Sequence, residues 1–276
     1  MRSPRLQWFR RSVWLALLLA GFVWLTLGVE QRLVFRPAPG PTSPQDAGLA
    51  HYTQHAFTAR DGARIPYWSN LQQAAGPCRG PVVIYFHGNG SGLHGHTALL
   101  DGLDKRQLCV VAMEYRGYPG APGKASERGI VNDAVALYDA LARQYPQRPI
   151  ILWGYSLGSG VAVQAAVQRQ PSALVLEAPF TSVVARAKEL FPYAPTFLMR
   201  NRFDSIGTIA QVQAPLLILH GTDDGVIPLA MGEQLYAAAN PPKQLERYAG
   251  AHHTDLWKTR AYDDAAAFIL SLGLTF

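Results

Sequence analysis

The sequence predicts one domain of the α/β class, with a mostly parallel central sheet of about eight strands and helices on both faces. Three observations lead to this class. Short apolar runs without charge recur along the chain, stretches with helical periodicity separate them, and 276 residues with 49% hydrophobic content can bury a substantial core. Such alternation favours right-handed βαβ crossovers and an open sheet covered by helices.

The charge of the chain is concentrated at its start. The formal net charge is +6, but residues 1–11 hold four arginines and no acid, so the remainder is close to neutral. A nearly neutral domain has no basic stripe for a phosphate backbone. We therefore expect no nucleic-acid partner.

Residues 1–11 form a basic N-terminus, and residues 12–29 follow it with no charged side chain. Eighteen helical residues extend about 27 Å, close to the hydrocarbon thickness of about 30 Å. We expect a transmembrane signal anchor, with the basic N-terminus in the cytosol and the folded domain that follows on the exported side, periplasmic or extracytoplasmic. A cleaved signal peptide has the same pattern and stays open as an alternative.

Residues 30–50 are rich in proline and glycine and are expected to form a linker. The α/β domain would then cover residues 51–276. At its start, residues 54–70 are predicted to form two strands around Asp61-Gly62, because this dipeptide between apolar or β-branched residues is a hairpin signal.

Five apolar runs predict buried strands, because strands of a parallel sheet are covered on both faces. They are residues 81–86, 108–114, 149–154, 172–177 and 214–220. Helices are expected at residues 97–106, 126–145, 157–169, 182–190 and 229–240. Residues 243–250 supply a last strand, and residues 257–272 a last helix with an apolar face.

One of these strands ends in the sequence Gly154-Tyr155-Ser156-Leu157-Gly158 and passes directly into a helix. In this context a G-x-S-x-G motif places its serine on a strained turn that only glycines can flank. Catalytic groups gather at the carboxyl ends of strands in open α/β sheets, which makes Ser156 the predicted nucleophile. The alternative is a glycine-rich turn whose serine caps the helix.

A serine nucleophile needs a base and an acidic group that orients the base, in the chain order serine, acid, histidine. Asp223 and Asp224 follow one predicted strand, and His252 and His253 follow the next. The residues by themselves predict a triad and leave open which member of each pair takes part.

Seven motifs stand in order between about residue 33 and the C-terminus: LVFRP, FHGNG, EYRGYPG, GYSLGSG, APFTS, HGTDDGVIP and GAHHTD. Together they resemble the α/β-hydrolase superfamily. Within it they are most similar to compact, often membrane-anchored serine hydrolases, which include depalmitoylating thioesterases, lysophospholipases and monoacylglycerol lipases. The resemblance implies an α/β-hydrolase fold with a small or absent lid and catalysis without a cofactor.

The family pattern also implies which residues act. Its acid lies four residues after the histidine of an HG pair, which implies Asp224 and leaves Asp223 on a variable position. Its last motif has one histidine before a polar pair ending in Asp, which implies His253, while His252 stands where glycine is common. Glu177 is a rival acid, because some relatives draw theirs from the strand that it ends.

The resemblance further implies an oxyanion hole made by the backbone N–H groups of Leu157 and Asn89. His87 matches a structural histidine of the family, so we expect no chemistry from it. The apolar and aromatic residues 191–203 either line an acyl pocket or pack as core beneath a helix. No histidine or cysteine has metal-ligand spacing, so no metal is expected.

We therefore expect a serine hydrolase that cleaves a carboxylic ester or thioester, with an acyl or lipid-like substrate, through an acyl-enzyme intermediate. A cofactor-free haloperoxidase, a perhydrolase or an amidase would use the same triad. A catalytically silent binding module is the rival from another class, and a complete triad argues against it. The sequence does not give acyl length, leaving group or oligomeric state.

Two cysteines, Cys78 and Cys109, lie near the starts of strands that are parallel neighbours in this fold. Both then stand at one end of the sheet, where a Cα separation under about 7 Å is feasible. A disulfide could form outside the cytosol. Two free thiols are the alternative, with Cys109 in the core.

Overall fold

The computed structural model describes residues 28–73 and 76–275. The basic N-terminus and almost all of the expected anchor at 12–29 lie outside these residues. Within the described ranges there is no helix with the length and apolarity that a bilayer crossing requires.

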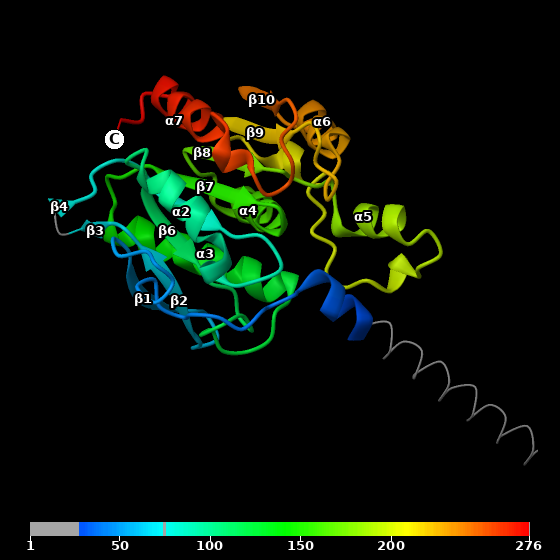
Figure 1. The fold of residues 1–276 in the computed structure, drawn as a ribbon, viewed down its shortest axis with the longest axis horizontal. Helices are drawn as coiled ribbons and strands as arrows, with labels where there is room; N and C mark the ends of the chain where they lie inside the picture. The colour runs from blue at the N-terminus through cyan, green and yellow to red at the C-terminus, as the bar shows by residue number, and fades with distance from the viewer. Residues whose placement is uncertain (1–27, 74–75, 276) are drawn as a thin grey trace, which may run out of the picture.

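A central sheet of eight strands crosses the described part of the chain in the order β1-β2-β6-β5-β7-β8-β9-β10 (Figure 1). Strand β2 is antiparallel to both of its neighbours, and all other neighbouring pairs are parallel. The strands are β1 (Thr53–Thr58), β2 (Arg64–Ser69), β5 (Val82–Phe86), β6 (Cys109–Met113), β7 (Ile150–Tyr155), β8 (Ala173–Glu177), β9 (Leu216–Gly221) and β10 (Lys243–Tyr248). The predicted fold class is confirmed.

The burial of each strand follows its place in the sheet. Every residue of β5 to β9 is buried, as their unbroken apolar runs require, whereas the edge strands β1 and β10 carry exposed side chains. The predicted hairpin pairs β1 with β2, and Gly62 turns between them with a φ of +84°. A short pairing of β3 (Gln72–Gln73) with β4 (Gly76–Pro77) had no signal in the sequence.

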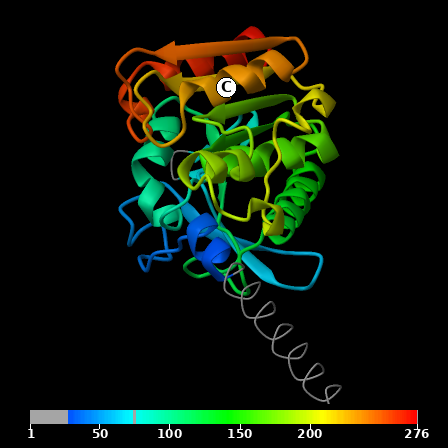
Figure 2. The ribbon, with the colours of Figure 1, turned by 90° about the vertical axis from the view of Figure 1, so that its right-hand side faces the viewer.

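Helices cover both faces of the sheet, and Figure 2 shows α2 and α3 on opposite sides of it. Side chains of α3, α4 and α6 pack into the hydrophobic core on one face, and those of α2 and α7 into the core on the other. The helices are α2 (Thr97–Asp104), α3 (Glu127–Gln144), α4 (Leu157–Arg169), α5 (Val183–Leu190), α6 (Leu229–Ala238) and α7 (Ala261–Ser271). Each lies inside its predicted range.

Short 3₁₀ helices connect these elements at η1 (Leu93–His96), η2 (Thr196–Leu198), η3 (Ile209–Gln211) and η4 (Leu256–Lys258). The last one replaces the first turn of the helix predicted from residue 257. Two serines cap helices as expected of their type: Ser126 accepts the N–H of Gly129 before α3, and Ser182 that of Ala185 before α5.

Residues 30–50 pack on the domain, so the expectation of a linker is corrected. Val34 and Phe35 are buried in the core on the side of α3 and α4, and Leu49 and Tyr52 in the core on the other side. Proline and glycine set the path of this segment, but the apolar residues between them gain stability by leaving water. The domain therefore includes residues 34–50.

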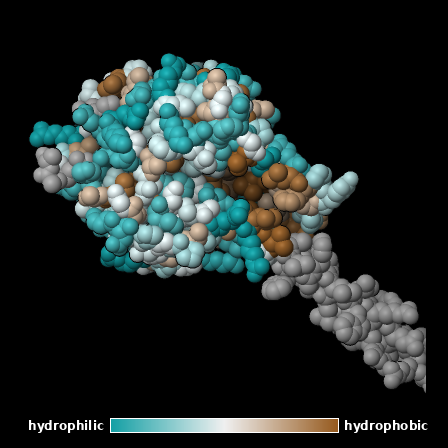
Figure 3. All heavy atoms as spheres, viewed as in Figure 1, coloured by the Kyte–Doolittle hydropathy of each residue, from teal (hydrophilic) through white to brown (hydrophobic). Residues whose placement is uncertain are grey.

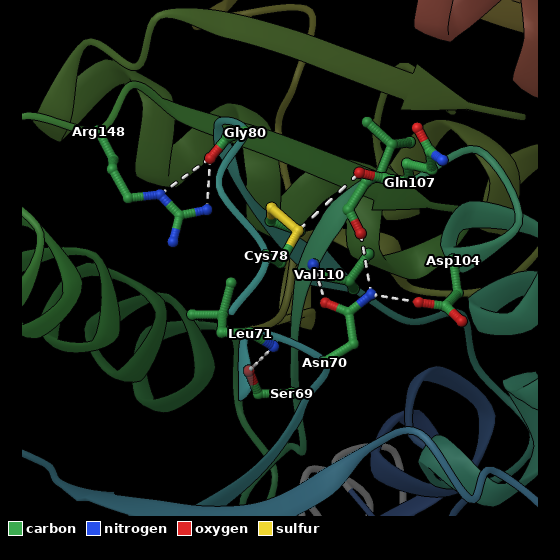
Figure 4. The surroundings of a disulfide bond; sticks show 11 residues. Ser69, Asn70, Leu71, Cys78, Gly80, Asp104, Gln107, Val110 and Arg148 are labelled. Carbon is green, nitrogen blue, oxygen red and sulfur yellow. Dashed lines mark hydrogen bonds between the residues drawn. A yellow bond between two sulfur atoms is a disulfide. The ribbon is translucent and has the colours of Figure 1, made fainter. Parts of the chain in front are cut away.

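A disulfide joins Cys78 and Cys109, with a Cα separation of 5.6 Å (Figure 4). Cys109 begins β6, where it pairs in parallel register with Val82 of β5. The two cysteines thus stand at the same end of neighbouring strands, as the fold predicts. Nearby, the Asn70 side chain accepts the N–H of Val110 at 2.6 Å and ties the chain after β2 to the same strand. The structure decides for the disulfide and against two free thiols.

Candidate active site

Ser156 occupies the turn between β7 and α4. Its φ of +51° and ψ of −117° lie outside the regions that side chains normally allow. A Cβ atom on Gly154 would overlap the carbonyl oxygen of Gly158, and one on Gly158 would overlap that of Phe86. The Ser156 N–H donates to the carbonyl of Glu177 at 2.9 Å, which fastens the turn to β8. The predicted strand–turn–helix context is present.

Three side chains from three strand ends meet at this turn. His253 Nε2 lies 2.9 Å from Ser156 Oγ, and His253 Nδ1 lies 2.7 Å from Asp224 Oδ2. The hydrogen-bond pattern places the imidazole proton on Nδ1, which donates it in a hydrogen bond to the carboxylate. The unprotonated Nε2 then accepts the hydrogen bond of the serine O–H. All three residues are buried. Parallel strands bring residues after β7, β9 and β10 to one edge of the sheet.

The Asp224 carboxylate is held on both oxygens. Its Oδ1 accepts the N–H groups of Val226 and Ile227, each at 2.8 Å, and its Oδ2 faces His253 and, at 3.5 Å, His220 Nε2. Burial by itself raises the pKa of Asp224, but hydrogen bonds from His220, His253 and the backbone outweigh it and hold that pKa below its usual range. The carboxylate therefore stays ionised beside the imidazole.

The alternative residues lie elsewhere. His252 Nδ1 is 2.9 Å from the carbonyl oxygen of Asp223, and both residues are exposed. The Glu177 carboxylate accepts hydrogen bonds from Trp153 Nε1 at 3.1 Å and Tyr262 OH at 3.2 Å, and burial raises its pKa to about 7. The hydrogen-bonded relay that contains the serine therefore excludes His252, Asp223 and the rival acid Glu177.

The two residues expected to donate to the oxyanion border the cavity at the nucleophile. Leu157 and Asn89 line the same cavity as Ser156. Within the described residues, the backbone N–H groups of Leu157 and Asn89 have no hydrogen-bond acceptor. They are free to bind an oxyanion, as the family resemblance implies.

The side chain of Asn89 has a role that the sequence did not reveal. Its Oδ1 accepts hydrogen bonds from the Arg36 N–H at 2.8 Å, the Gly90 N–H at 2.9 Å and the Tyr118 hydroxyl at 3.0 Å. These bonds fix the loop after β5 and connect it to the chain that precedes β1. Only the position of Arg36 in the LVFRP motif could have suggested this contact.

His87 belongs to the support of this loop. It is buried, its Nε2 lies 2.9 Å from Glu114 Oε1, and its ring stacks on Tyr115 with centroids 3.8 Å apart. It makes no contact with the triad, in agreement with a structural role. Within the described residues, no group of three or more His, Cys, Asp and Glu side chains is arranged to hold a metal ion.

A cavity of about 590 Å³ opens at the nucleophile. Its walls come from residues 29–36, from the segment between α5 and Met199, and from Val226 and Ile227 beside the triad acid. Most of the lining is apolar, and Figure 3 shows brown side chains around a hollow on this side of the molecule. Residues 183–203, which we call the cap, form the small lid of the fold.

Comparison with known proteins places the chain in a family. The family described as serine aminopeptidase, S33, matches residues 79–205. An uncharacterized protein of Mycobacterium tuberculosis is 35% identical over 243 residues, which cover 87% of this chain and 86% of that protein. The lysophosphatidylserine lipase ABHD12 of Gallus gallus is 30% identical over 258 residues, 79% of this chain and 68% of the lipase.

The chain belongs to the α/β-hydrolase superfamily. Among solved structures, an esterase of Pyrococcus furiosus has a TM-score of 0.67 at 18% sequence identity. The match covers 86% of this chain and 98% of the esterase chain. The acetyl xylan esterase of Paenibacillus sp. R4 has a TM-score of 0.63 at 17% sequence identity, and the match covers 82% of this chain and 85% of the esterase chain. At this identity the likeness concerns the fold. The family confirms the predicted enzyme class, a serine hydrolase of the α/β-hydrolase type.

Glu30 holds the cap of this α/β hydrolase in place. Its Oε1 accepts hydrogen bonds from the Arg200 N–H at 3.0 Å, the Asn201 N–H at 2.7 Å and the Asn201 side-chain amide at 2.8 Å. The residue is buried and lines the cavity. Sequence reasoning missed it, because a single acid in a segment that resembles a linker carries no signal. The chain before β1 and the cap thus form two connected walls of one cavity.

Proposed function

We propose that this α/β hydrolase is an esterase or thioesterase for medium-chain or long-chain acyl substrates, with Ser156, His253 and Asp224 as its catalytic triad. The observation that carries the proposal is the hydrogen-bonded relay from Asp224 to Ser156, which ends in an apolar cavity of about 590 Å³. This volume lies within the range of small-molecule sites. The similarity to a lysophosphatidylserine lipase supports a lipid-like substrate.

The chemistry follows from the geometry. Ser156 Oγ attacks the acyl carbonyl carbon while His253 Nε2 accepts the hydroxyl proton, and the Asp224 carboxylate stabilises the imidazolium. The N–H groups of Leu157 and Asn89 bind the oxyanion. When the tetrahedral intermediate collapses, His253 returns the proton to the leaving oxygen or sulfur. Water then attacks the acyl-enzyme by the same route and releases the free acid and Ser156.

Labelling with a fluorophosphonate tests the nucleophile. The enzyme should be labelled and the folded Ser156→Ala variant should not, because the reagent reacts only with an activated serine. Undiminished labelling of the variant would overturn the assignment, and an unlabelled wild-type enzyme would favour the silent binding module.

A series of p-nitrophenyl esters of increasing chain length tests the substrate class. We expect kcat/KM to rise from acetate to medium or long acyl chains, because each added methylene leaves water for the apolar cavity. Highest kcat/KM with acetate and a fall with every added carbon would contradict an acyl-binding cavity.

We also propose that residues 12–29 anchor the enzyme in a membrane with its catalytic domain on the exported side. The arginines ahead of the apolar run support this orientation. The disulfide between Cys78 and Cys109 supports an oxidising compartment. The enzyme should stay with membranes after a high-salt wash. Recovery of a soluble mature form without residues 1–28 would indicate a cleaved signal peptide.

A further inference from the structure

Large apolar side chains are exposed around the mouth of the cavity. Most of those exposed in the described residues belong to the cavity walls or to the cap between them: Val29, Leu33, Leu190, Phe191, Tyr193, Phe197 and Val226. Figure 3 shows brown side chains gathered on the side where α5 lies in Figure 1. Soluble monomers rarely expose such patches unless a partner covers them.

Within the described residues, two of these side chains are largely unpacked. Tyr193 is fully exposed and Phe197 is 79% exposed, and neither lines the cavity. Their neighbours in the cap, such as Phe191 and Leu198, do line it. Folding gains little from aromatic side chains in water, so Tyr193 and Phe197 are placed for contact with something outside the chain.

Exposed basic residues belong to the same two segments as the apolar patch. Arg32 and Arg36 flank it on the chain before β1, and exposed basic residues of the cap flank it on the other side: Lys188, Arg200 and Arg202. Glu30 is buried under its hydrogen bonds and Glu189 pairs with Arg186 at 2.8 Å. Arg202 interacts with Glu127, so the positive charge at the patch comes from Arg32, Arg36, Lys188 and Arg200. Aromatic and aliphatic side chains ringed by basic ones fit an anionic lipid surface.

The position of the patch in the chain selects a bilayer over a protein partner. Residues 28–34 are helical, and they follow directly on the uncharged run at 12–29. Val29 ends that run and already lines the cavity, and Leu33 lies one helical turn further, about 6 Å along the axis. A membrane that held the run at 12–29 would therefore meet the molecule at the mouth of the cavity.

We propose that this face docks on an anionic lipid bilayer, with Tyr193 and Phe197 inserted below the headgroups, so that the cavity opens toward lipid. The basic residues around the patch then face the headgroups. A lipid-like substrate enters the cavity from the leaflet without crossing water. The docking rests on the proposed anchor and is independent of the proposed catalytic activity.

Fluorescence of the full-length chain tests the docking. The Phe197→Cys variant, in a Ser156→Ala background, is labelled with an environment-sensitive fluorophore and reconstituted in phosphatidylcholine vesicles that contain phosphatidylglycerol and a nitroxide-bearing lipid. The native cysteines are joined in a disulfide and do not react without reductant. The matched control is Leu270→Cys, an exposed apolar residue on α7, which lies away from the cap in Figure 1.

We expect the nitroxide lipid to quench the label at position 197 several-fold more than the label at 270. Equal, weak quenching at both positions, with free access of aqueous iodide, would overturn the proposal. Weak quenching together with protection from iodide and cross-linking of two chains would overturn it as well, because a second copy would then cover the face. This readout needs no catalysis, so it decides docking even if no ester is cleaved.

Kinetics of the Tyr193→Ser, Phe197→Ser double variant give a second test. Loss of two inserted aromatic side chains should lower kcat/KM about tenfold on a long-chain ester embedded in vesicles. Turnover of a soluble short-chain ester should stay unchanged, because neither residue lines the cavity. The Leu270→Ser variant should leave both rates unchanged. Equal loss on both substrates would mean that the two residues support the cap and do not bind lipid.

Discussion

At the scale of single residues, adjacent and chemically identical side chains have different surroundings. Asp224 is buried and bound to His253, whereas Asp223 is exposed and bonds with the neighbouring Thr222 hydroxyl. His252 differs from His253 in the same way, since its ring hydrogen-bonds to the Asp223 carbonyl and not to a carboxylate. Consecutive residues after a strand point in different directions, so only one of each pair joins the relay that ends at Ser156.

The catalytic roles are tested by substitution within each pair. His253→Ala and Asp224→Asn should each lower kcat by several orders of magnitude, because the first removes the base and the second its orienting charge. His252→Ala and Asp223→Asn are the matched controls and should change kcat little. The measurement is steady-state hydrolysis of a p-nitrophenyl ester. A larger loss from His252→Ala than from His253→Ala would reverse the assignment.

The Asn89 side chain should affect the transition state more than substrate binding. Asn89→Ala removes the acceptor of three hydrogen bonds and lets the loop that carries the Asn89 N–H move, so kcat should fall about 10²-fold with little change in KM. Tyr118→Phe removes one of those bonds and should cost far less. A rise in KM at constant kcat would show that the loop binds substrate and not the oxyanion.

Glu177 should make the stability of the fold depend on pH. Burial raises its pKa from 4.5 to about 7, so the folded state binds more protons than the unfolded state between these values. Its stabilising effect is complete below about pH 4.5 and is lost as the pH rises toward 7. The glutamine of the Glu177→Gln variant cannot ionise. The free energy of unfolding of the variant, relative to wild type, should therefore increase with pH by on the order of 3 kcal/mol in total.

Urea denaturation of wild type and the Glu177→Gln variant at pH 5 and 8 measures this difference. The control is Glu233→Gln, which makes the same change at an exposed acid that pairs with Arg247 at the surface. Taking the difference between variant and wild type removes the effect of other groups, such as His96, whose pKa burial lowers to about 3. A difference that does not change with pH would contradict a buried acid that ionises near neutrality.

At the scale of elements, close contacts between strands and helices fix both the nucleophile turn and the disulfide. The turn between β7 and α4 needs Gly154 and Gly158, because the backbone of the turn and of β5 occupies the place of their side chains. The disulfide needs β5 and β6 as parallel neighbours, which brings Cys78 and Cys109 to one end of the sheet. Both features depend on the pairing of β5 with its two neighbours.

The Cys78→Ser variant should unfold more readily. The disulfide connects residues 31 positions apart, and closing such a loop stabilises a fold by about 3 to 4 kcal/mol on the chain-entropy estimate. Denaturant unfolding under oxidising conditions measures the loss. Dithiothreitol should destabilise the wild-type protein by a similar amount and leave the variant unchanged. If the denaturant midpoint changed neither in the Cys78→Ser variant nor in the reduced wild-type protein, the disulfide would contribute nothing to stability.

At the scale of the whole molecule, residues 29–36, which precede β1, are part of the active-site architecture. It supplies one wall of the cavity, the Arg36 N–H that binds Asn89, and the Glu30 carboxylate that binds the cap. Substitution of a buried, hydrogen-bonded carboxylate lowers the free energy of unfolding, because its donors are left without an acceptor. The segment next to the expected anchor therefore affects the geometry of the site directly.

Glu30→Ala should loosen the cap. It leaves the donors of Arg200 and Asn201 unpaired, so KM for a long-chain ester should rise about tenfold, and the free energy of unfolding should fall by about 2 kcal/mol. Turnover of a short-chain ester should change less. Glu189→Ala, which removes an exposed cap acid outside the cavity lining, is the control. Equal effects of the two substitutions would contradict the role of Glu30.

The sequence by itself determined the features that local patterns encode. Unbroken apolar runs gave the strands of the parallel sheet, helical periodicity gave the helices, and the G-x-S-x-G motif between a strand and a helix gave Ser156. Each depends on residues close together in the chain. The resemblance to a family added the choice of Asp224 and His253, which the pairs of identical residues had left open.

Only the tertiary structure decided the contacts between distant parts of the chain. Glu30 meets Asn201 across 171 positions, and Arg36 meets Asn89 across 53. A proline-rich composition predicts a linker, yet Val34 and Phe35 are buried, because the core that they join forms only when α3 and α4 pack on the sheet. Such contacts depend on shape complementarity between elements. A pattern within one segment cannot reveal this complementarity, because half of the contact surface belongs to another part of the chain.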